Sequence, residues 1–204
     1  TPDFFRFCDG TTLTSITMRA EVIDPNVHFP SGLVSLHLMV TNEPFNTAIF
    51  APLTRLQQMD VSLFHNKEPV DLSGLVSLTK LNGGGLTVST VPPSLVECSV
   101  SVKGDIDLSP LNLLTRLELS VQNDISVTFP THLKELGLWS GERIARSNLA
   151  TVQLESFSTL QCPITPAVLE MLPKTLRRFT GWVQSPSLAE QMKEMFPLLE
   201  TSKN

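Results

Sequence analysis

The sequence has few charged residues, few cysteines and no long apolar run. Only 17% of its 204 residues are charged, against roughly 25% in a typical globular domain. The net charge of −5 argues against a nucleic-acid partner, because phosphate backbones are bound by basic surfaces. No apolar stretch approaches the roughly 18 residues that a membrane-spanning helix requires. At 41% hydrophobic residues the chain can still bury a sizeable core.

The three cysteines, Cys8, Cys98 and Cys162, are odd in number and far apart, so they suggest no disulfide framework. The sequence also has no Asn-x-Ser/Thr glycosylation site. Both absences favour a reducing, intracellular compartment, and we expect a cytoplasmic location. The sequence shows no signal peptide. It opens on Thr1 rather than methionine, so a lost targeting segment and a longer parent protein stay open.

No motif indicates a reaction or a bound cofactor. The glycine-rich stretch at residues 82–86 lacks the spacing of a phosphate-binding loop, and we interpret it as a turn at the end of a strand. The histidines show no metal-ligand spacing, and no serine lies in a Gly-x-Ser-x-Gly motif. Cys98 is predicted to be a buried thiol. We therefore expect no catalytic residue, no metal and no cofactor, and a protein that is not an enzyme.

What the sequence does contain is a repeated frame. Residues 29–38 (FPSGLVSLHL) and 129–138 (FPTHLKELGL) share Phe-Pro, two residues, then Leu-x-x-Leu-x-Leu. Residues 91–100 and 172–181 keep the same frame with substitutions, and residues 72–84 and 108–121 form a second subtype. The first leucines of the frames are 17 to 23 residues apart: Leu13, Leu33, Leu56, Leu78, Leu95, Leu114, Leu133, Leu154 and Leu176.

This spacing predicts stacked coils with one short strand each. In Leu-x-Leu the two leucines point to one side of a strand and the middle residue points to the other. A single strand cannot bury its leucines alone, but stacked coils bury them against each other and pair the strands into a parallel sheet. The proline before most frames stops the preceding element and turns the chain into the strand.

The frame resembles the leucine-rich repeats, in particular the short proline-led repeats of about 20 residues in bacterial effector proteins and in amoeboid protozoa. The resemblance covers roughly residues 11–183. It implies an α/β solenoid: a curved domain with a parallel β-sheet on its concave face, an irregular or short-helical convex side, and a C-terminal capping helix. The expected boundaries are an N-terminal cap at 1–10, about nine repeats at 11–184, and the capping helix with a tail at 185–204.

Proteins of this family are mostly protein-recognition scaffolds. The resemblance therefore implies a non-enzymatic protein–protein interaction module that belongs to a larger intracellular protein. One alternative is the regulatory or substrate-recognition domain of a multidomain enzyme, a ligase or phosphatase, whose catalytic part is absent. The other is a secreted or surface repeat protein used for adhesion. The expected partner is a protein, with no nucleic acid and no membrane span.

The residues between the leucines are predicted to line the exposed face of the sheet. Trp139 and Trp182 are the only tryptophans, and both follow the last apolar position of a frame. Leu160 occupies the equivalent position, directly after the last residue of the frame, in the repeat between them. Strands lie about 4.8 Å apart, so the two indoles are expected about 10 Å from each other. The predicted partner-binding site is Arg116, Glu118, Glu135, Trp139, Leu160 and Trp182.

Each of these residues also has a structural explanation. Trp182 could pack under the C-terminal helix, and Trp139 could cover an edge of the core. The charged residues could be ordinary solubilising pairs worth about 0–1 kcal/mol each.

Overall fold

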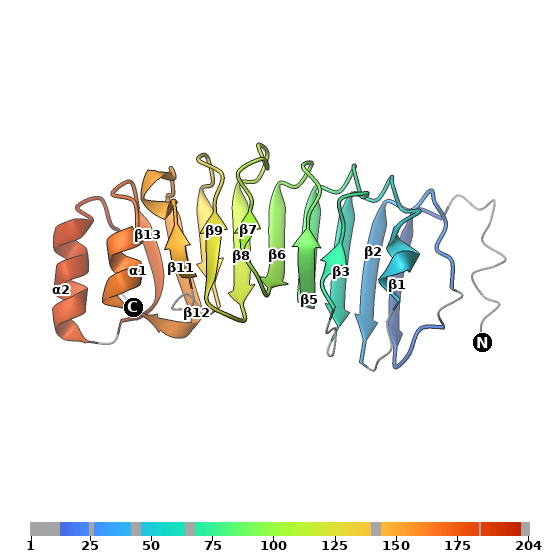
Figure 1. The fold of residues 1–204 in the computed structure, drawn as a ribbon, viewed down its shortest axis with the longest axis horizontal. Coiled ribbons are helices and arrows are strands. Elements are labelled where there is room, and N and C mark those ends of the chain that lie inside the picture. Colours follow the sequence, from blue (N-terminus) through green and yellow to red (C-terminus); the bar gives the residue numbers. More distant parts are fainter. Residues whose placement is uncertain are drawn as a thin grey trace. The chain divides into compact units, whose positions relative to one another are not determined.

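The computed structural model describes residues 13–24, 27–41, 46–63, 68–139, 144–183 and 185–200. It divides into two compact units, Thr1–Ser101 (unit 1) and Val102–Asn204 (unit 2). Each unit is a parallel β-solenoid of stacked coils with few helices (Figure 1). The predicted N-terminal cap at residues 1–10 lies outside the described residues. The predicted boundaries at residues 10 and 184 stay predictions.

In unit 1 the main sheet is formed by parallel strands that pair in chain order. The short strand β4 (Val70–Asp71) pairs with the second half of β5 instead, and a 3-10 helix η2 (Thr47–Phe50) follows the coil of β2. The main-sheet strands are β1 (Ser15–Ala20), β2 (Ser35–Val40), β3 (Gln58–Leu63), β5 (Lys80–Thr90) and β6 (Glu97–Val102).

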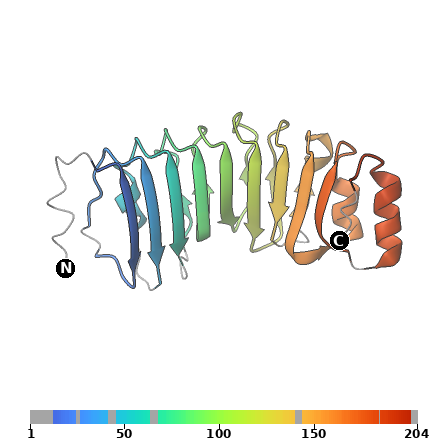
Figure 2. The same cartoon turned by 180° about the vertical axis from the view of Figure 1, so that it is seen from behind.

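In unit 2 the coils contribute to two parallel sheets. The main sheet has the order β8 (Arg116–Val121), β10 (Glu135–Leu138), β12 (Ser156–Ile164) and β13 (Arg178–Val183). The second sheet consists of β7 (Ile106–Asp107), β9 (Ile125–Thr128) and β11 (Ile144–Ser147). The remaining elements are the 3-10 helix η4 (Leu149–Thr151) and the helices α1 (Pro166–Met171) and α2 (Pro186–Met195). Figure 2 shows the row of main-sheet strands from the other side.

The leucine frame forms the core. The first leucines of the frames are completely buried in every frame from the second to the ninth: Leu33, Leu56, Leu78, Leu95, Leu114, Leu133, Leu154 and Leu176. Leu13, which opens the first frame, is only half-buried. Cys98 is buried at an inward position, as predicted, and burial raises the pKa of its thiol to about 12. The repeated architecture predicted from the period is therefore confirmed.

The layer opposite the main sheet differs from the prediction, which expected irregular or short-helical segments there. In unit 2 it is largely a second parallel sheet. The reason is visible along β9, where Ile125, Val127 and then Phe129 are buried while Ser126 and Thr128 between them are not. Alternation with period two is the pattern of a strand with one buried face. Strand pairing then satisfies the backbone of this layer as well.

The glycine-rich stretch at residues 82–86 lies inside a strand rather than in a turn at its end. The register of β5 with β6 shifts between Asn82 and Thr87, and beyond this shift Val88 and Thr90 pair with β4. Gly85 has φ +73°, a left-handed conformation that favours glycine. A Cβ at Gly85 would overlap the carbonyl oxygen of Leu63 on the neighbouring strand. The predicted turn at the end of a strand is therefore replaced by an irregularity within β5.

The C-terminal helix forms where the sequence places it. The Ser185 hydroxyl accepts a hydrogen bond from the Leu188 N–H at 3.3 Å, and Pro186 takes the first helical position. Leu188, Met192 and then Phe196 are buried, which gives α2 the predicted apolar stripe. Its role as a cap stays a prediction.

We predict that Gly85→Ala lowers the free energy of unfolding by about 2 kcal/mol or more, because the left-handed conformation strains an L-residue and its Cβ meets backbone. Gly74→Ala is the matched control in the same unit, since nothing lies within 4 Å of its added Cβ, and it should change stability by less than about 0.5 kcal/mol. Urea denaturation measures both. Equal stability of the two variants would contradict this account of β5.

Asn148 joins two coils of unit 2 through both groups of its amide. Its Oδ1 accepts from the Phe129 N–H at 2.7 Å, and its Nδ2 donates to the Phe129 carbonyl at 2.9 Å. Asn148→Ala removes both hydrogen bonds to the Phe129 main chain, so we predict a loss of about 2 kcal/mol in unfolding free energy, about 1 kcal/mol for each bond. Asn148→Asp keeps the acceptor and should lose less. A lower unfolding free energy for Asn148→Asp than for Asn148→Ala in chemical denaturation would contradict this prediction.

Candidate functional site

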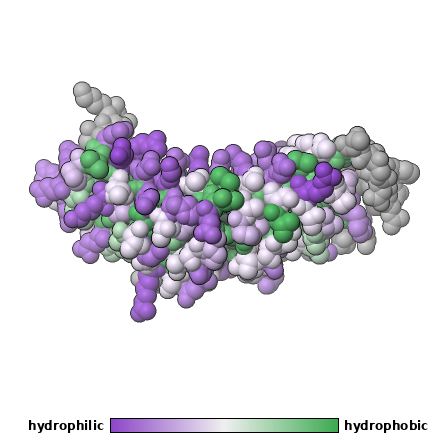
Figure 3. All heavy atoms as spheres, turned by 90° about the horizontal axis from the view of Figure 1, so that it is seen from above, coloured by the Kyte–Doolittle hydropathy of each residue, from purple (hydrophilic) through white to green (hydrophobic). Residues whose placement is uncertain are grey.

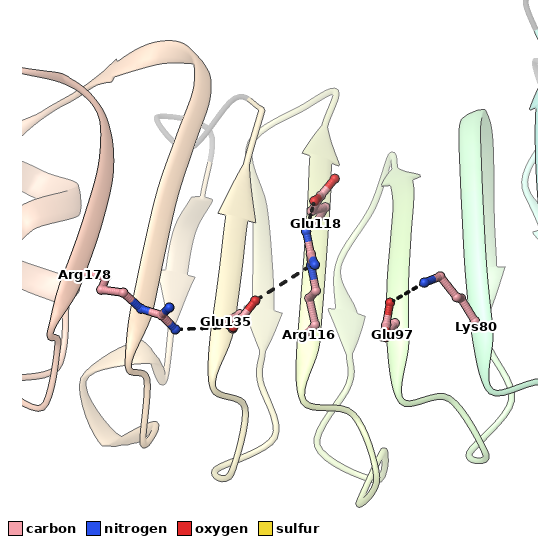
Figure 4. Close-up of polar contacts among 6 residues, drawn as sticks. All are labelled: Lys80, Glu97, Arg116, Glu118, Glu135 and Arg178. Atoms are coloured by element: carbon pink, nitrogen blue, oxygen red, sulfur yellow. Dashed lines mark hydrogen bonds and ion pairs between the residues drawn. The ribbon is translucent and has the colours of Figure 1, made fainter. Parts of the chain in front are cut away.

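Three predicted site residues form one hydrogen-bonded and ionic row on the main sheet of unit 2 (Figure 4). Glu135 on β10 lies between two arginines: its Oε2 is 3.8 Å from Arg116 Nε, and its Oε1 is 3.4 Å from an Arg178 Nη. Arg116 also pairs with Glu118 on its own strand β8, at 3.2 Å. The structure thus brings Arg116, Glu118 and Glu135 together, and adds Arg178.

The strand register explains this row. Arg116, Glu135, Ser156 and Arg178 occupy directly paired positions on β8, β10, β12 and β13. The two arginines are thus on either side of Glu135, but Arg178 is two strands away from it. Ser156 is small, so the long side chain of Arg178 can extend across β12 to reach Glu135. We call these side chains, together with Glu118, the charged row.

The charged row is neutral in sum and exposed to solvent. Two guanidinium groups balance two carboxylates, and the exposed fraction of the side chains runs from 30% for Glu118 to 55% for Arg178. Exposed ion pairs contribute little to folding, typically about 0–1 kcal/mol each. The row therefore presents charges of both signs to solvent while contributing little to stability.

Trp182 on β13 is 81% exposed, the most exposed large apolar side chain among the described residues. It therefore does not pack under α2, which was the structural explanation for this residue. It lies four residues after Arg178 on the same strand. An indole in this position offers a large rigid surface beside the charged row.

The predicted alignment of Trp182 with Leu160 is wrong. The register of β12 with β13 shifts after the pair Ser158 and Thr180, and Trp182 pairs with Pro163. Extra residues of β12 between these two pairs cause the shift. The backbone of Leu160 belongs to β12, but its side chain lies outside the described part of the chain. The separation of about 10 Å expected between the two indoles depended on this alignment and does not follow from the observed register.

Gly181 fits this irregular stretch. A Cβ on Gly181 would overlap the Thr159 hydroxyl of the neighbouring strand, and its φ of +156° is one that L-residues rarely adopt. Thr159 is buried, and its Oγ1 has no hydrogen-bond partner. The glycine at this frame position, where three other repeats have leucine (Leu38, Leu119 and Leu138), thus accommodates the bulged strand β12.

Trp139 follows β10 directly and is half-buried. Its backbone N–H donates to the Leu119 carbonyl at 3.0 Å, so its main chain continues the pairing with β8. A half-buried side chain fits both a contact with a partner and a cover over the edge of the core, so both roles stay predictions.

Unit 1 carries polar rows that the predicted site omitted. On β2 and β3, His37 Nδ1 is 3.0 Å from Asp60 Oδ2, and Asn82 on β5 donates to the other oxygen of Asp60 at 3.3 Å. Lys80 and Glu97 pair at 2.8 Å (Figure 4). Their positions beside inward-facing frame residues were the only available signal. Pairing across strands requires the register, which the sequence shows only approximately.

Other acidic groups serve the turns. A hydrogen bond from the Thr90 hydroxyl, followed by those from Ser73, lowers the pKa of Asp71 below its ordinary value. Bonds from the Ser109 side chain and N–H do the same to the pKa of Asp107. Both carboxylates accept from the N–H two residues on, at 2.9 Å, and thereby close equivalent turns of the two Asp-Leu-Ser repeats. These groups are structural.

The described residues contain no group of three or more His, Cys, Asp or Glu side chains placed to hold a metal ion. Among the helices described, none has the length and apolar character needed to cross a membrane. Figure 3 shows one side of the molecule, where polar residues predominate and apolar residues form separate patches.

We predict that Glu135→Ala changes the unfolding free energy by less than about 1 kcal/mol, because the charged row is exposed. A double-mutant cycle with Arg178→Ala should give a coupling energy of about 0.2–1 kcal/mol that falls as salt is added. A coupling above about 3 kcal/mol that is insensitive to salt would show instead that the row is part of the folding core.

The sequence matches no family model and no curated protein. The described residues form a parallel β-solenoid of repeated coils. Its second unit carries an exposed tryptophan and a row of charges aligned by the strand register.

Proposed function

We propose that this chain is a leucine-rich-repeat protein that acts as a non-enzymatic protein-binding module. The contact surface is the part of unit 2 that carries the charged row and Trp182, with Trp139 at its border. In this proposal the parallel sheet corresponds to the concave face of the repeat family, and α2 covers the C-terminal end of the core. The partner is a protein, and the module belongs to a larger cytoplasmic protein.

The observation that carries the proposal is the exposure of Trp182. An indole that is 81% exposed is available to bury a large area on binding, and tryptophan is enriched at binding hot spots. Hot spots are typically surrounded by weaker contacts. The charged row fits that role, because charges of both signs orient a partner more than they strengthen its binding.

The charges also favour a protein partner over a highly charged polymer. The charged row sums to zero, with Arg116 and Arg178 set against Glu118 and Glu135. A nucleic acid or another polyanion needs a basic surface. A folded protein with mixed surface charges can match both signs. The two alternatives, a recognition domain of a ligase or phosphatase and a surface adhesin, use the same surface in another molecular context and stay predictions.

We predict that Trp182→Ala weakens partner binding by about 2 kcal/mol, roughly thirtyfold in Kd, without loss of folding. The partner is first isolated by affinity capture from the source organism with the wild-type chain, and Kd is then measured with the purified pair. Trp139→Ala should weaken binding by a similar amount if it also lies in the contact.

Leu113→Ala is the matched control for this experiment. Leu113 is also a large exposed apolar side chain of unit 2, 56% exposed, but it lies in the turn before β8 rather than on a strand. The Kd of the Leu113→Ala variant for the partner should equal that of the wild type. Unchanged Kd for Trp182→Ala, or equal weakening by Leu113→Ala, would remove the sheet face of unit 2 as the contact surface.

A further inference from the structure

The sequence contains one pair of neighbouring arginines, Arg177 and Arg178, and Thr180 follows this pair after a single residue. No other serine or threonine of the chain has arginine at both the third and the second position before it. Protein kinases select their substrates partly by charge pattern, and carboxylates of an acidic kinase site hold arginine side chains through paired hydrogen bonds. The Arg-Arg-x-Thr stretch has the pattern that an arginine-directed serine/threonine kinase binds.

Thr180 is exposed to solvent on the face of the sheet that carries the charged row. Arg178 and Thr180 are both exposed on β13, with Phe179 between them. The Phe179 ring lies on the opposite side, where it stacks on the ring of Phe157 with centroids 6.1 Å apart. Because side chains alternate along a strand, Arg178 and Thr180 share the outer face. The hydroxyl and one of its two arginines are therefore presented together.

β13 is held to the sheet by few apolar contacts. It buries none of its six residues: Phe179 and Val183 are half-buried, and the others are exposed. By comparison, β8 buries three residues, Leu117, Leu119 and Val121. Segments with few buried apolar contacts open at a low cost in free energy. β13 can therefore be presented to a kinase, which binds its target as an extended segment.

β8 shows where a negative charge at this position finds a partner. The strand register aligns Thr180 on β13 with Glu118 on β8, through β10 and β12. The Glu118 carboxylate pairs with Arg116, two residues before it on the same strand, at 3.2 Å. Arg178 lies two residues before Thr180 in the same way. A phosphate on Thr180 would therefore have a guanidinium group within reach on its own strand.

We propose that Thr180 is a phosphorylation site for an arginine-directed serine/threonine kinase, and that Arg178 pairs with the phosphate. In the reaction the Thr180 Oγ1 forms a bond to the γ-phosphorus of ATP while the bond from that phosphorus to the β-phosphate oxygen breaks. ADP leaves, and the hydroxyl proton passes to a base of the kinase. This site goes beyond the proposed protein-binding function and does not depend on it.

Phosphorylation makes the charged row acidic. The row is neutral without it, and a phosphate adds a charge of about −1.5 to −2 at pH 7. The phosphate also competes with Glu135 for Arg178, whose Nη is 3.4 Å from the Glu135 carboxylate (Figure 4). Arg178 reaches Glu135 only across β12, whereas the phosphate lies on its own strand. We expect Arg178 to turn to the phosphate and Glu135 to keep Arg116 as its partner.

The experiment incubates the intact 204-residue chain with magnesium, ATP and a purified kinase that selects arginine at the third and second positions before its target. Wild type, Thr180→Val and Arg177→Gln are compared, and mass spectrometry with fragmentation locates the phosphate. We expect phosphate on Thr180 in the wild type and none at this position in Thr180→Val. Labelling of Arg177→Gln should be about tenfold slower, because paired charge-assisted hydrogen bonds to the kinase are lost.

Thr180→Ser keeps a hydroxyl and should be phosphorylated at the same position. A wild-type chain that gains no phosphate, or gains it only at another residue, would overturn the proposal. An unchanged rate for Arg177→Gln would also overturn it, since the arginine pair would then not be what the kinase binds. Fragmentation of the wild-type chain locates the phosphate without any variant, so a variant that fails to fold leaves the test intact.

The pairing with Arg178 is tested by NMR on the phosphorylated chain. The Arg178 side-chain Nε–H resonance should move when Thr180 is phosphorylated, because the guanidinium group changes its partner. Arg55, which is exposed in a turn of unit 1, is the matched control, and its resonance should stay in place. An Arg178 resonance that does not move, in a chain fully phosphorylated at Thr180, would overturn the assignment of Arg178 as the phosphate partner.

Discussion

The structure depends on one constraint: no coil can bury its apolar residues without its neighbours. Each coil is a thin two-layer loop, so a leucine such as Leu136 is buried only because Leu117 lies directly beside it in register. Solenoids are stabilised by such contacts between adjacent repeats. A slip of one residue in register would turn every leucine of a strand toward solvent. The apolar frame therefore specifies the register as well as the core.

The candidate surface is a consequence of the same register. Once the leucines are aligned inward, the residues between them form rows across the sheet, and Arg116, Glu135, Ser156 and Arg178 form one such row. Because these side chains are exposed, substituting them has little effect on the free energy of unfolding. Under the proposed function, changes in the row alter the choice of partner while the frame is kept. Proposed function and fold are thus specified by different positions of the same repeat.

The core could be predicted from the sequence because the first position of all nine frames is leucine. The second sheet of unit 2 was missed, although Ile125, Val127 and Phe129 alternate in the required way, because strands of two to four residues give a weak signal. The bulge of β12 could not be detected, since the interval from Leu154 to Leu176 is within the normal range and hides extra residues inside it. Arg178 was missed as a partner of Glu135 because their contact crosses an intervening strand over a small serine.

The most direct test of this account is the parallel register of the unit 2 sheet, measured by backbone nuclear Overhauser effects. The account predicts contacts between Glu135 and both Arg116 and Ser156, and between Trp182 and Pro163. Contacts between Trp182 and the backbone of Leu160 would contradict the bulge in β12. An antiparallel pattern, or no contact between successive coils, would contradict the stacked solenoid itself.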